Sequence, residues 1–392
     1  MQPVICSIAR TPIGRFNGGL GPLSAMDLGG VAIAGALDRA GLAGSDVDEV
    51  LFGHVLQAGQ GQITARQAAV RAGVPMTVPA VTINKVCLSG LTAIQEAANH
   101  VRLGESTFVV AGGMESMTNA PYVLPGAREG YRMGNKEVVD VMTHDGLFCA
   151  FDACMMGESS DRKNDDLGVG RTEQDAWSAS SHARAAAATD DGTFAREIVP
   201  VSVPQRRGEP IDVDRDEGIR AGTTAESLGS LRPAFHPGGT ITAGNASQIS
   251  DGAAAVVVAD RAAAEAAGLP IIAEIVGYGQ TAGPDATLHE RPAEALRVAL
   301  KRSSLDVEDL DLVEFNEAFA SVALWSARML GIDDGRVNVH GGAVALGHPL
   351  GATGARIIVT LLNALAARGG EFGAAALCGG GGQGDAMIVR MM

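Results

Sequence analysis

The chain has 392 residues, too many for one ordinary hydrophobic core, so we expect two or three domains. Charged residues make up 19% and aromatic residues 4%, whereas glycine (52 residues) and small apolar residues abound, as is typical of tightly packed α/β layers. The formal net charge of −15 argues against nucleic acid as the main partner, and any anionic ligand must be bound by locally gathered basic groups.

Cysteine usage and the apolar stretches favour a cytoplasmic protein. The five cysteines are an odd number without C-x-x-C spacing, which favours neither a disulfide framework nor a zinc site. The start of the chain lacks a positively charged segment followed by an apolar run, so we expect no signal peptide. The uncharged stretch Val337–Ala355 contains five glycines, a composition that argues against a membrane helix.

The first part of the chain alternates expected strands and helices. Ser24 or Asp27 can cap a helix that runs to Ala40. Alternating elements of this kind predict parallel strand pairing with right-handed crossovers. The further expected elements are strands at Val4–Ala9, Val50–Gly53, Val81–Asn84 and Thr107–Ala111, and helices at Ile63–Ala72 and Ser89–Arg102.

The pattern changes between Met114 and Ile249, and then returns. The clearest element of this stretch is a helix from Thr172 to Ala188, which predicts an insertion made of a cap domain or substrate loops. Beyond it we expect strands at Ala253–Ala259 and Ile271–Val276 and a helix at Pro292–Lys301.

Three stretches of the second part repeat stretches of the first, which predicts two copies of one βα unit. With the loop region inserted in the first copy, residues 1–117 plus 250–270 form an N-terminal core half, 118–249 a loop domain and 271–392 a C-terminal core half. The matching pairs are Ser45–Phe52 with Glu308–Phe315, Ser89–Ile94 with Thr353–Ile357, and Val110–Gly113 with Leu377–Gly380.

Cys87 and His348 occupy nearly equivalent turns of the two copies, each just before an expected helix. The partial positive charge of a helix N-terminus favours a thiolate at Cys87, and the same amides could stabilise an oxyanion; the alternative is a buried structural cysteine. His348, held before Pro349, suits proton transfer near neutral pH, or is a buried, hydrogen-bonded histidine. If the copies pack around a pseudo-twofold axis, the two turns meet.

Two further candidates lie at strand ends. Cys378 opens the glycine run Gly379–Gly384, where backbone amides can approach a substrate closely, although a flexible loop has a similar composition. Asn316 follows the strand at Val313 and could hold a water or a carbonyl oxygen, or could be an ordinary helix N-cap. Ligands gather beyond the carboxyl ends of strands in open parallel sheets, so four such candidates favour a functional site.

Six motifs run along the chain: NKVCLSG (Asn84–Gly90), GGMESM (Gly112–Met117), TAGNASQISDGAA (Thr242–Ala254), NEAFA (Asn316–Ala320), GGAVALGHPLGATGAR (Gly341–Arg356) and CGGGGQG (Cys378–Gly384). Taken together, these motifs resemble the thiolase family over essentially the whole chain, and within it they are most similar to the biosynthetic acetyl-CoA acetyltransferases. The resemblance implies a duplicated αβαβα five-layer core, an inserted loop domain that binds coenzyme A and takes part in tetramerisation, and a homotetramer built from dimers.

The resemblance implies a role for each candidate: Cys87 as the acylated nucleophile, His348 as its base and Cys378 as a second acid/base. Asn316, through a water, completes one oxyanion site with His348, and the amides of Cys87 and Gly380 form the other. The implied reaction joins two acetyl-CoA molecules into acetoacetyl-CoA and free CoA, reversibly and without a cofactor. The positions that match coenzyme A contacts are Arg220, Ser227, Ser247, Leu147, Met156, Leu231, Phe235, Ala243, Ala318 and Phe319.

Departures from the family pattern bear on specificity. Met155-Met156-Gly157 stands where His-Met-Gly is frequent, Leu88 stands where small residues are common and could narrow the acyl pocket, and His340 replaces a usual Asn. Leu88 and the NKVC setting favour short acyl chains. The alternatives are a degradative 3-ketoacyl-CoA thiolase for longer chains and a catalytically silent acyl-CoA or lipid binder.

Overall fold

The structure is a computed structural model that describes residues 1–392, and its core is one long mixed sheet. The strands follow the order β14-β15-β16-β13-β1-β12-β5-β3-β4, with the short β2 also paired to β12. Their bounds are β1 Pro3–Arg10, β2 Gly14–Arg15, β3 Glu49–Gly53, β4 Ala80–Ile83, β5 Phe108–Ser116, β12 Ser250–Asp260, β13 Ala273–Ala282, β14 Leu312–Phe315, β15 Phe372–Gly379 and β16 Gln383–Met391.

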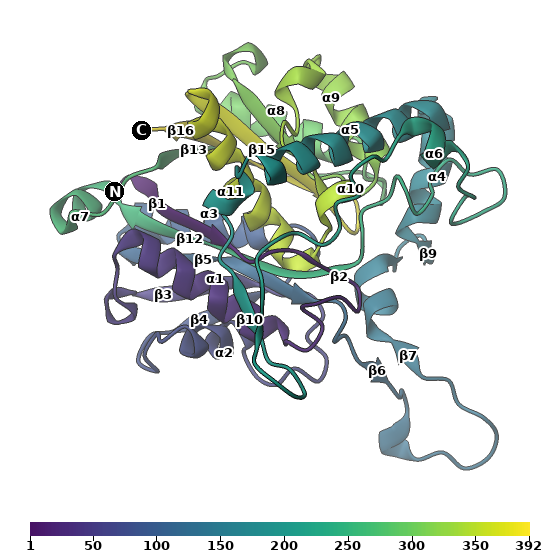
Figure 1. The fold of residues 1–392 in the computed structure, drawn as a ribbon, viewed down its shortest axis with the longest axis horizontal. Coiled ribbons are helices and arrows are strands. Elements are labelled where there is room, and N and C mark those ends of the chain that lie inside the picture. Colours follow the sequence, from purple (N-terminus) through teal and green to yellow (C-terminus); the bar gives the residue numbers. More distant parts are fainter.

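The N-terminal and C-terminal halves of this sheet form two strand layers, and helices lie outside each half and between them, so the core has five layers in all (Figure 1). Separate apolar clusters hold α1 and α2 on the N-terminal half, α8 and α9 on the C-terminal half, and α3 with α11 between the halves. The predicted duplicated five-layer α/β fold is therefore confirmed. The helix bounds are α1 Ala25–Ala40, α2 Thr64–Arg71, α3 Ser89–Leu103, α7 Arg261–Ala267, α8 Arg291–Ser303, α9 Ala320–Leu330, α10 Ala343–Leu346 and α11 Leu350–Arg368.

The predicted parallel pairing is wrong for much of the sheet. Only β3 with β4, β3 with β5, and β14 with β15 pair in parallel, whereas the central strands β12, β1, β13 and β16 pair antiparallel. The glycine run after Cys378 explains one reversal, because Gly381 and Gly382 have φ of 79° and 69° and so form a tight turn from β15 into β16.

Equivalent aspartates make the same backbone clamp in the two copies. The carboxylate of Asp48 accepts hydrogen bonds from the amides of Thr107 and Phe108 at 2.6 and 2.9 Å, just before β5. Asp311 accepts from Glu371 and Phe372 at 2.7 and 2.9 Å, just before β15. The internal repeat thus extends to the hydrogen bonds that fix strand starts.

The two inner helices cross at equivalent glycines. A Cβ on Gly90 of α3 would lie 2.8 Å from the amide nitrogen of Ala355, and one on Gly354 of α11 would lie 2.3 Å from that of Leu91. The backbones therefore touch, which brings the N-terminal turns of both helices together. Helix α11 is long and apolar enough to cross a membrane, but 89% of its most apolar window is buried, so it is a core helix.

The insertion between β5 and β12 wraps around one end of the core. Its helices are α4 Met156–Leu167, α5 Arg171–Asp190 and α6 Ala225–Gly229, and its hairpins pair β6 Tyr122–Val123 with β7 Val139–Asp140, β8 Phe148–Cys149 with β9 Cys154–Met155, and β10 Val201–Val203 with β11 Ile211–Val213. The β6–β7 arm projects away from the body (Figure 1). The domain limits given above remain a prediction.

Candidate functional site

The turn that carries Cys87 is fixed from both copies. The Nζ of Lys85 lies 2.8 and 3.0 Å from the two carboxylate oxygens of Asp385, a buried residue of β16 in the second copy. Val86 has φ of 51°, a left-handed conformation that is strained for a β-branched residue. Tertiary contacts such as the Lys85–Asp385 ion pair stabilise this strained turn. The turn places Cys87 at the start of α3.

The Cys87 thiol meets the His348 imidazole, as the duplication predicts. The Sγ of Cys87 lies 3.1 Å from the Nε2 of His348. The Thr353 hydroxyl lies 2.9 Å from the Pro349 carbonyl oxygen, to which it donates, so its oxygen accepts from Nδ1 of His348 at 2.6 Å. We infer from this network that the proton of the neutral ring is on Nδ1, which leaves Nε2 free to accept the Cys87 proton.

Cys87 and Cys378 line one apolar cavity with His348. Gly380 also lines it, and the amides of Cys87 and Gly380 both donate toward the Cys87 sulfur. The other residues around the cavity are Leu147, Met156, Ser247, Leu288, Ala318, Phe319, Leu350 and Gly379. Leu288, Leu350 and Gly379 were not predicted as site residues. Leu350 and Gly379 lie within two of the quoted motifs, whereas nothing in the sequence around Leu288 indicates this position.

The expectation that Cys87 rests as a thiolate is wrong, because its burial outweighs the helix N-terminus. Burial raises the pKa of Cys87 to about 12, although the amides of Cys87 and Gly380 oppose the rise. The pKa of Cys378 is also raised, first by burial and then by Cys87. Burial and Arg356 lower the pKa of His348 to about 3. The resting site is therefore uncharged, and the thiol proton must move as the nucleophile attacks.

Asn316 completes the group from the end of β14. Its Nδ2 lies 3.4 Å from Nε2 of His348, and its buried Oδ1 has no hydrogen-bond partner. The N-cap alternative is wrong, because α9 starts at Ala320 and its N-cap is Phe319. An unpartnered buried oxygen beside the cavity is suited to a water or a substrate group.

Two buried histidines predict loss of stability in acid. Burial lowers the pKa of His289 to about 4 and of His348 to about 3, so between pH 6.5 and 4 the unfolded chain takes up protons that the folded chain does not. We expect the urea midpoint to fall as pH decreases from 7 to 5. His289→Gln should weaken that dependence, and an unchanged dependence would contradict the assignment.

The predicted coenzyme A contacts fall into two groups. Leu147, Met156, Ser247, Ala318 and Phe319 line the cavity. Phe235 packs edge-on against Phe319 with ring centroids 6.3 Å apart, which extends the apolar wall outward. The remaining four lie exposed on the loop domain, outside the cavity: Arg220, Ser227, Leu231 and Ala243.

The three residues that depart from the family pattern, Leu88, Met155 and His340, are not among those that line the Cys87 cavity. Leu88 is buried against Gly379 and in the central apolar cluster, so it is absent from the cavity wall. His340 lies edge-on to Phe194 with centroids 6.2 Å apart, and Met155 is the N-cap of α4. The expectation that Leu88 shortens the acyl pocket therefore lacks support, and nothing in the structure explains the exchange at His340.

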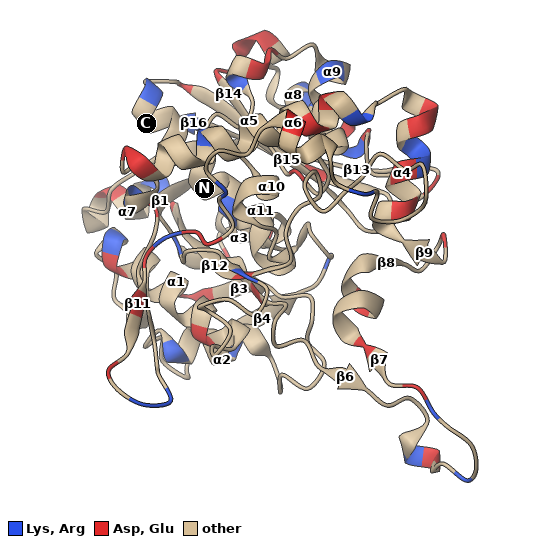
Figure 2. Cartoon of the chain, turned by 45° about the vertical axis from the view of Figure 1, so that its right-hand side comes forward, with Lys and Arg blue, Asp and Glu red and all other residues tan.

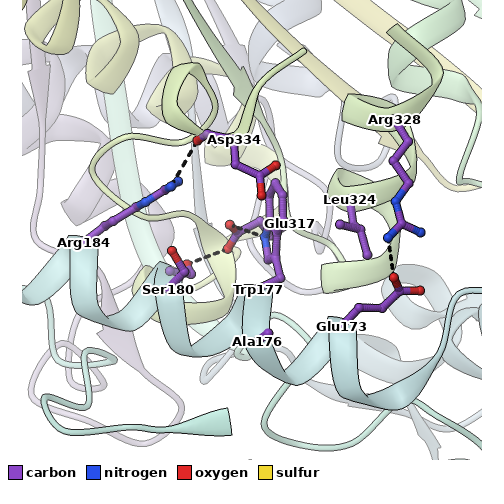
Figure 3. Close-up of a pocket in the computed structure, with 10 residues that line it drawn as sticks. Glu173, Ala176, Trp177, Ser180, Arg184, Glu317, Leu324, Arg328 and Asp334 are labelled. Carbon is purple, nitrogen blue, oxygen red and sulfur yellow. Dashed lines mark hydrogen bonds and ion pairs between the residues drawn. The ribbon is translucent and has the colours of Figure 1, made fainter. Parts of the chain in front are cut away.

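A second cavity lies between α5 and α9, away from the Cys87 thiol (Figure 3). Most of the residues that line it are polar or charged, and none of the predicted site residues lines it. Trp177, Arg184 and Glu317 point into it, and Glu173 pairs with Arg328 at one end. Figure 2 shows both signs of charge along α4 and at the tip of the β6–β7 arm, so neither surface offers a uniform field to an anion.

Comparisons with known proteins agree over the full length. Residues 3–262 match the family model "Thiolase, N-terminal domain" and residues 269–391 match "Thiolase, C-terminal domain". A "Probable acetyl-CoA acetyltransferase" of Mycolicibacterium smegmatis is 53% identical over 99% of this chain and 100% of its own length. The Escherichia coli "Acetyl-CoA acetyltransferase" is 48% identical over 99% of both. The crystal structure of the Bacillus anthracis acetyl-CoA acetyltransferase superposes with a TM-score of 0.97 at 40% identity, over 100% of this chain and 99% of that one.

Proposed function

Because the chain belongs to the thiolase family, we propose that it is an acetyl-CoA acetyltransferase. It joins two acetyl-CoA molecules into acetoacetyl-CoA and free CoA, and in reverse uses CoA to cleave acetoacetyl-CoA. The observation that carries this proposal is the contact between Cys87 Sγ and His348 Nε2, 3.1 Å apart in a cavity that also holds Cys378. The scheme requires neither a metal nor a redox cofactor.

In the first proposed step Cys87 becomes acetylated. His348 takes the thiol proton as Cys87 attacks the acetyl carbonyl, and the proton then passes to the departing CoA thiolate. The amides of Cys87 and Gly380 stabilise the oxyanion. A neutral His348 is the right form of the base for this step, and its lowered pKa supports that form.

In the second proposed step Cys378 removes an α-proton from another acetyl-CoA. The enolate oxygen lies in the oxyanion site of His348 and an Asn316-bound water. The carbanion attacks the acetyl group on Cys87, whose departing thiolate regains a proton. Cys378 starts as a thiol with a raised pKa, so it must first be deprotonated. In this scheme His348, neutral again after the first step, takes that proton and then returns it to the departing Cys87 thiolate.

The exposed loop-domain residues are proposed to bind the rest of coenzyme A. The exposed Arg220 offers a cation to the nucleotide phosphates, which matters in an acidic protein. Ser227 and Leu231 are also exposed on the loop domain, and Phe235 with Phe319 forms an apolar wall toward the cavity. Pantetheine would therefore run from Arg220 to Cys87, with Ser247 and Met156 near its thiol end.

We also propose a homotetramer in the cytoplasm. The projecting β6–β7 arm carries apolar side chains that are exposed in one chain, including Tyr122 (66%) and Met133 (93%). Apolar surface of this kind usually marks an interaction site. The edge strand β4 also presents Val81 to solvent (50%), which suits a dimer contact. Five unpaired cysteines agree with a reducing compartment.

A substrate series tests the chain-length preference. We expect acetoacetyl-CoA to be cleaved faster than longer 3-ketoacyl-CoAs, because Leu147, Met156 and Phe319 close the cavity around Cys87. Met156→Ala should raise kcat/KM for a six-carbon substrate relative to acetoacetyl-CoA by about tenfold, as removing several buried methylene-sized groups makes room. Equal or faster turnover of the longer substrate by the natural protein would instead favour a degradative 3-ketoacyl-CoA thiolase.

A further inference from the structure

Glu317, the residue after Asn316, is a buried carboxylate with a donor at every position. Its Oε1 accepts from Nε1 of Trp177 at 2.9 Å and from Nδ2 of Asn338 at 3.0 Å. Its Oε2 accepts from the hydroxyl of Ser181 at 2.8 Å and from the amide of Val344 at 3.0 Å. It is 1% exposed, and all four of its hydrogen-bond donors are uncharged groups. Burying a charge without a cation is costly, so these hydrogen bonds must hold a specific arrangement.

One branch of this network leads to Asn316. The side chain of Asn338 accepts from the amide of Phe315 at 2.8 Å and donates to its carbonyl oxygen at 2.9 Å. It thus pairs with Phe315 as the backbone of a neighbouring strand would. Asn338 itself has φ of 45°, a left-handed conformation. Because Phe315 directly precedes Asn316, the contact from Glu317 to Asn338 fixes the end of β14 that presents the Asn316 amide.

The other branch leads to His348. Val344 lies in α10, and the Ser181 hydroxyl that donates to Glu317 also accepts from the amide of Gly342 at 2.9 Å. A Cβ on Gly342 would lie 2.3 Å from the carboxyl carbon of Glu317, so only glycine fits here. Helix α10 ends at Leu346, two residues before His348, and Figure 3 shows Glu317 reached from α5 by Trp177.

We propose that Glu317 is a positioning residue, which joins the strand that carries Asn316 to the segment that carries His348 and so sets the spacing of their oxyanion site. It touches no substrate, since it faces the cavity between α5 and α9 instead of the one at Cys87. This inference rests on the proposed function. A misplacement near 1 Å in such a site can cost about 100-fold in rate.

The test is a double-mutant cycle of Glu317→Gln and Asn316→Ala, read as kcat and KM for acetoacetyl-CoA thiolysis. Glutamine keeps the shape but sets an amide group against N–H donors. We expect Glu317→Gln alone to lower kcat by about 10- to 100-fold with KM within about twofold. In the Asn316→Ala background it should cost less than about threefold, because the pair acts as a unit.

Ser181→Ala extends the test if Glu317→Gln does not fold, since it removes a single donor. Ser181→Ala should lower kcat several-fold, and its effect should be non-additive with that of Asn316→Ala. The control is Ser180→Ala, at the neighbouring position of α5 without a hydrogen bond to Glu317, and its kcat should match that of the natural protein. Fully additive losses, or a loss seen in KM alone, would overturn the inference. A natural protein that folds but cannot cleave acetoacetyl-CoA would overturn the proposed function instead.

Discussion

Cys87→Ala is expected to abolish acetyl transfer, with kcat at least about 10⁴-fold lower, because the variant lacks the thiol that lies against His348. The cavity contains another thiol, Cys378, but the Nε2 of His348 is paired with Cys87 at 3.1 Å. The measurement is covalent labelling with radioactive acetyl-CoA, followed by mass spectrometry of the modified peptide.

Cys378→Ala provides the matched control, because it removes the other buried thiol of the same cavity. This variant should still take up acetyl label on Cys87, since acylation uses Cys87 and His348, yet it should fail to condense or to cleave acetoacetyl-CoA. The assignment of the nucleophile is wrong if Cys87→Ala takes up label normally, or if label moves to Cys378 at an undiminished rate.

Gly354→Ala is expected to reduce the free energy of unfolding by about 2–3 kcal/mol, the cost of overpacking a filled core. The added methyl group would lie 2.3 Å from the amide nitrogen of Leu91, and backbone cannot rotate away as a side chain can. To relieve the contact, α3 and α11 must separate. Activity should fall as well, because the adjacent Thr353 orients His348. Urea unfolding and thiolysis kinetics measure the two effects.

Gly229→Ala is the corresponding control. Gly229 ends the surface helix α6, and a Cβ there would meet nothing within 4 Å. Alanine favours a helix over glycine, so stability should change by less than about 1 kcal/mol. If Gly354→Ala were as harmless as Gly229→Ala, the close crossing of the inner helices would not be a feature of the folded protein.

The amino-acid sequence by itself determined the fold class and indicated the candidate reactive residues. Apolar periodicity marks the strands and helices, and the similarity of Ser45–Phe52 to Glu308–Phe315 reveals the duplication. In the structure, Asp48 and Asp311 of these two stretches make equivalent hydrogen bonds to the backbone. Duplication also predicted that the Cys87 and His348 turns meet, because two copies of one unit place equivalent turns on either side of a common axis.

Only the tertiary structure decided what depends on distant neighbours. The antiparallel pairing of β12, β1, β13 and β16 is set by how the halves join, which strand periodicity does not encode. The raised pKa values of Cys87 and Cys378 follow from burial, whereas the sequence shows only a helix start. Leu88 lies outside the acyl cavity because its side chain packs against Gly379, a contact that the sequence does not reveal. Glu317 reads as an ordinary residue of NEAFA in the sequence, and only the fold brings four donors from three separate segments to its carboxylate.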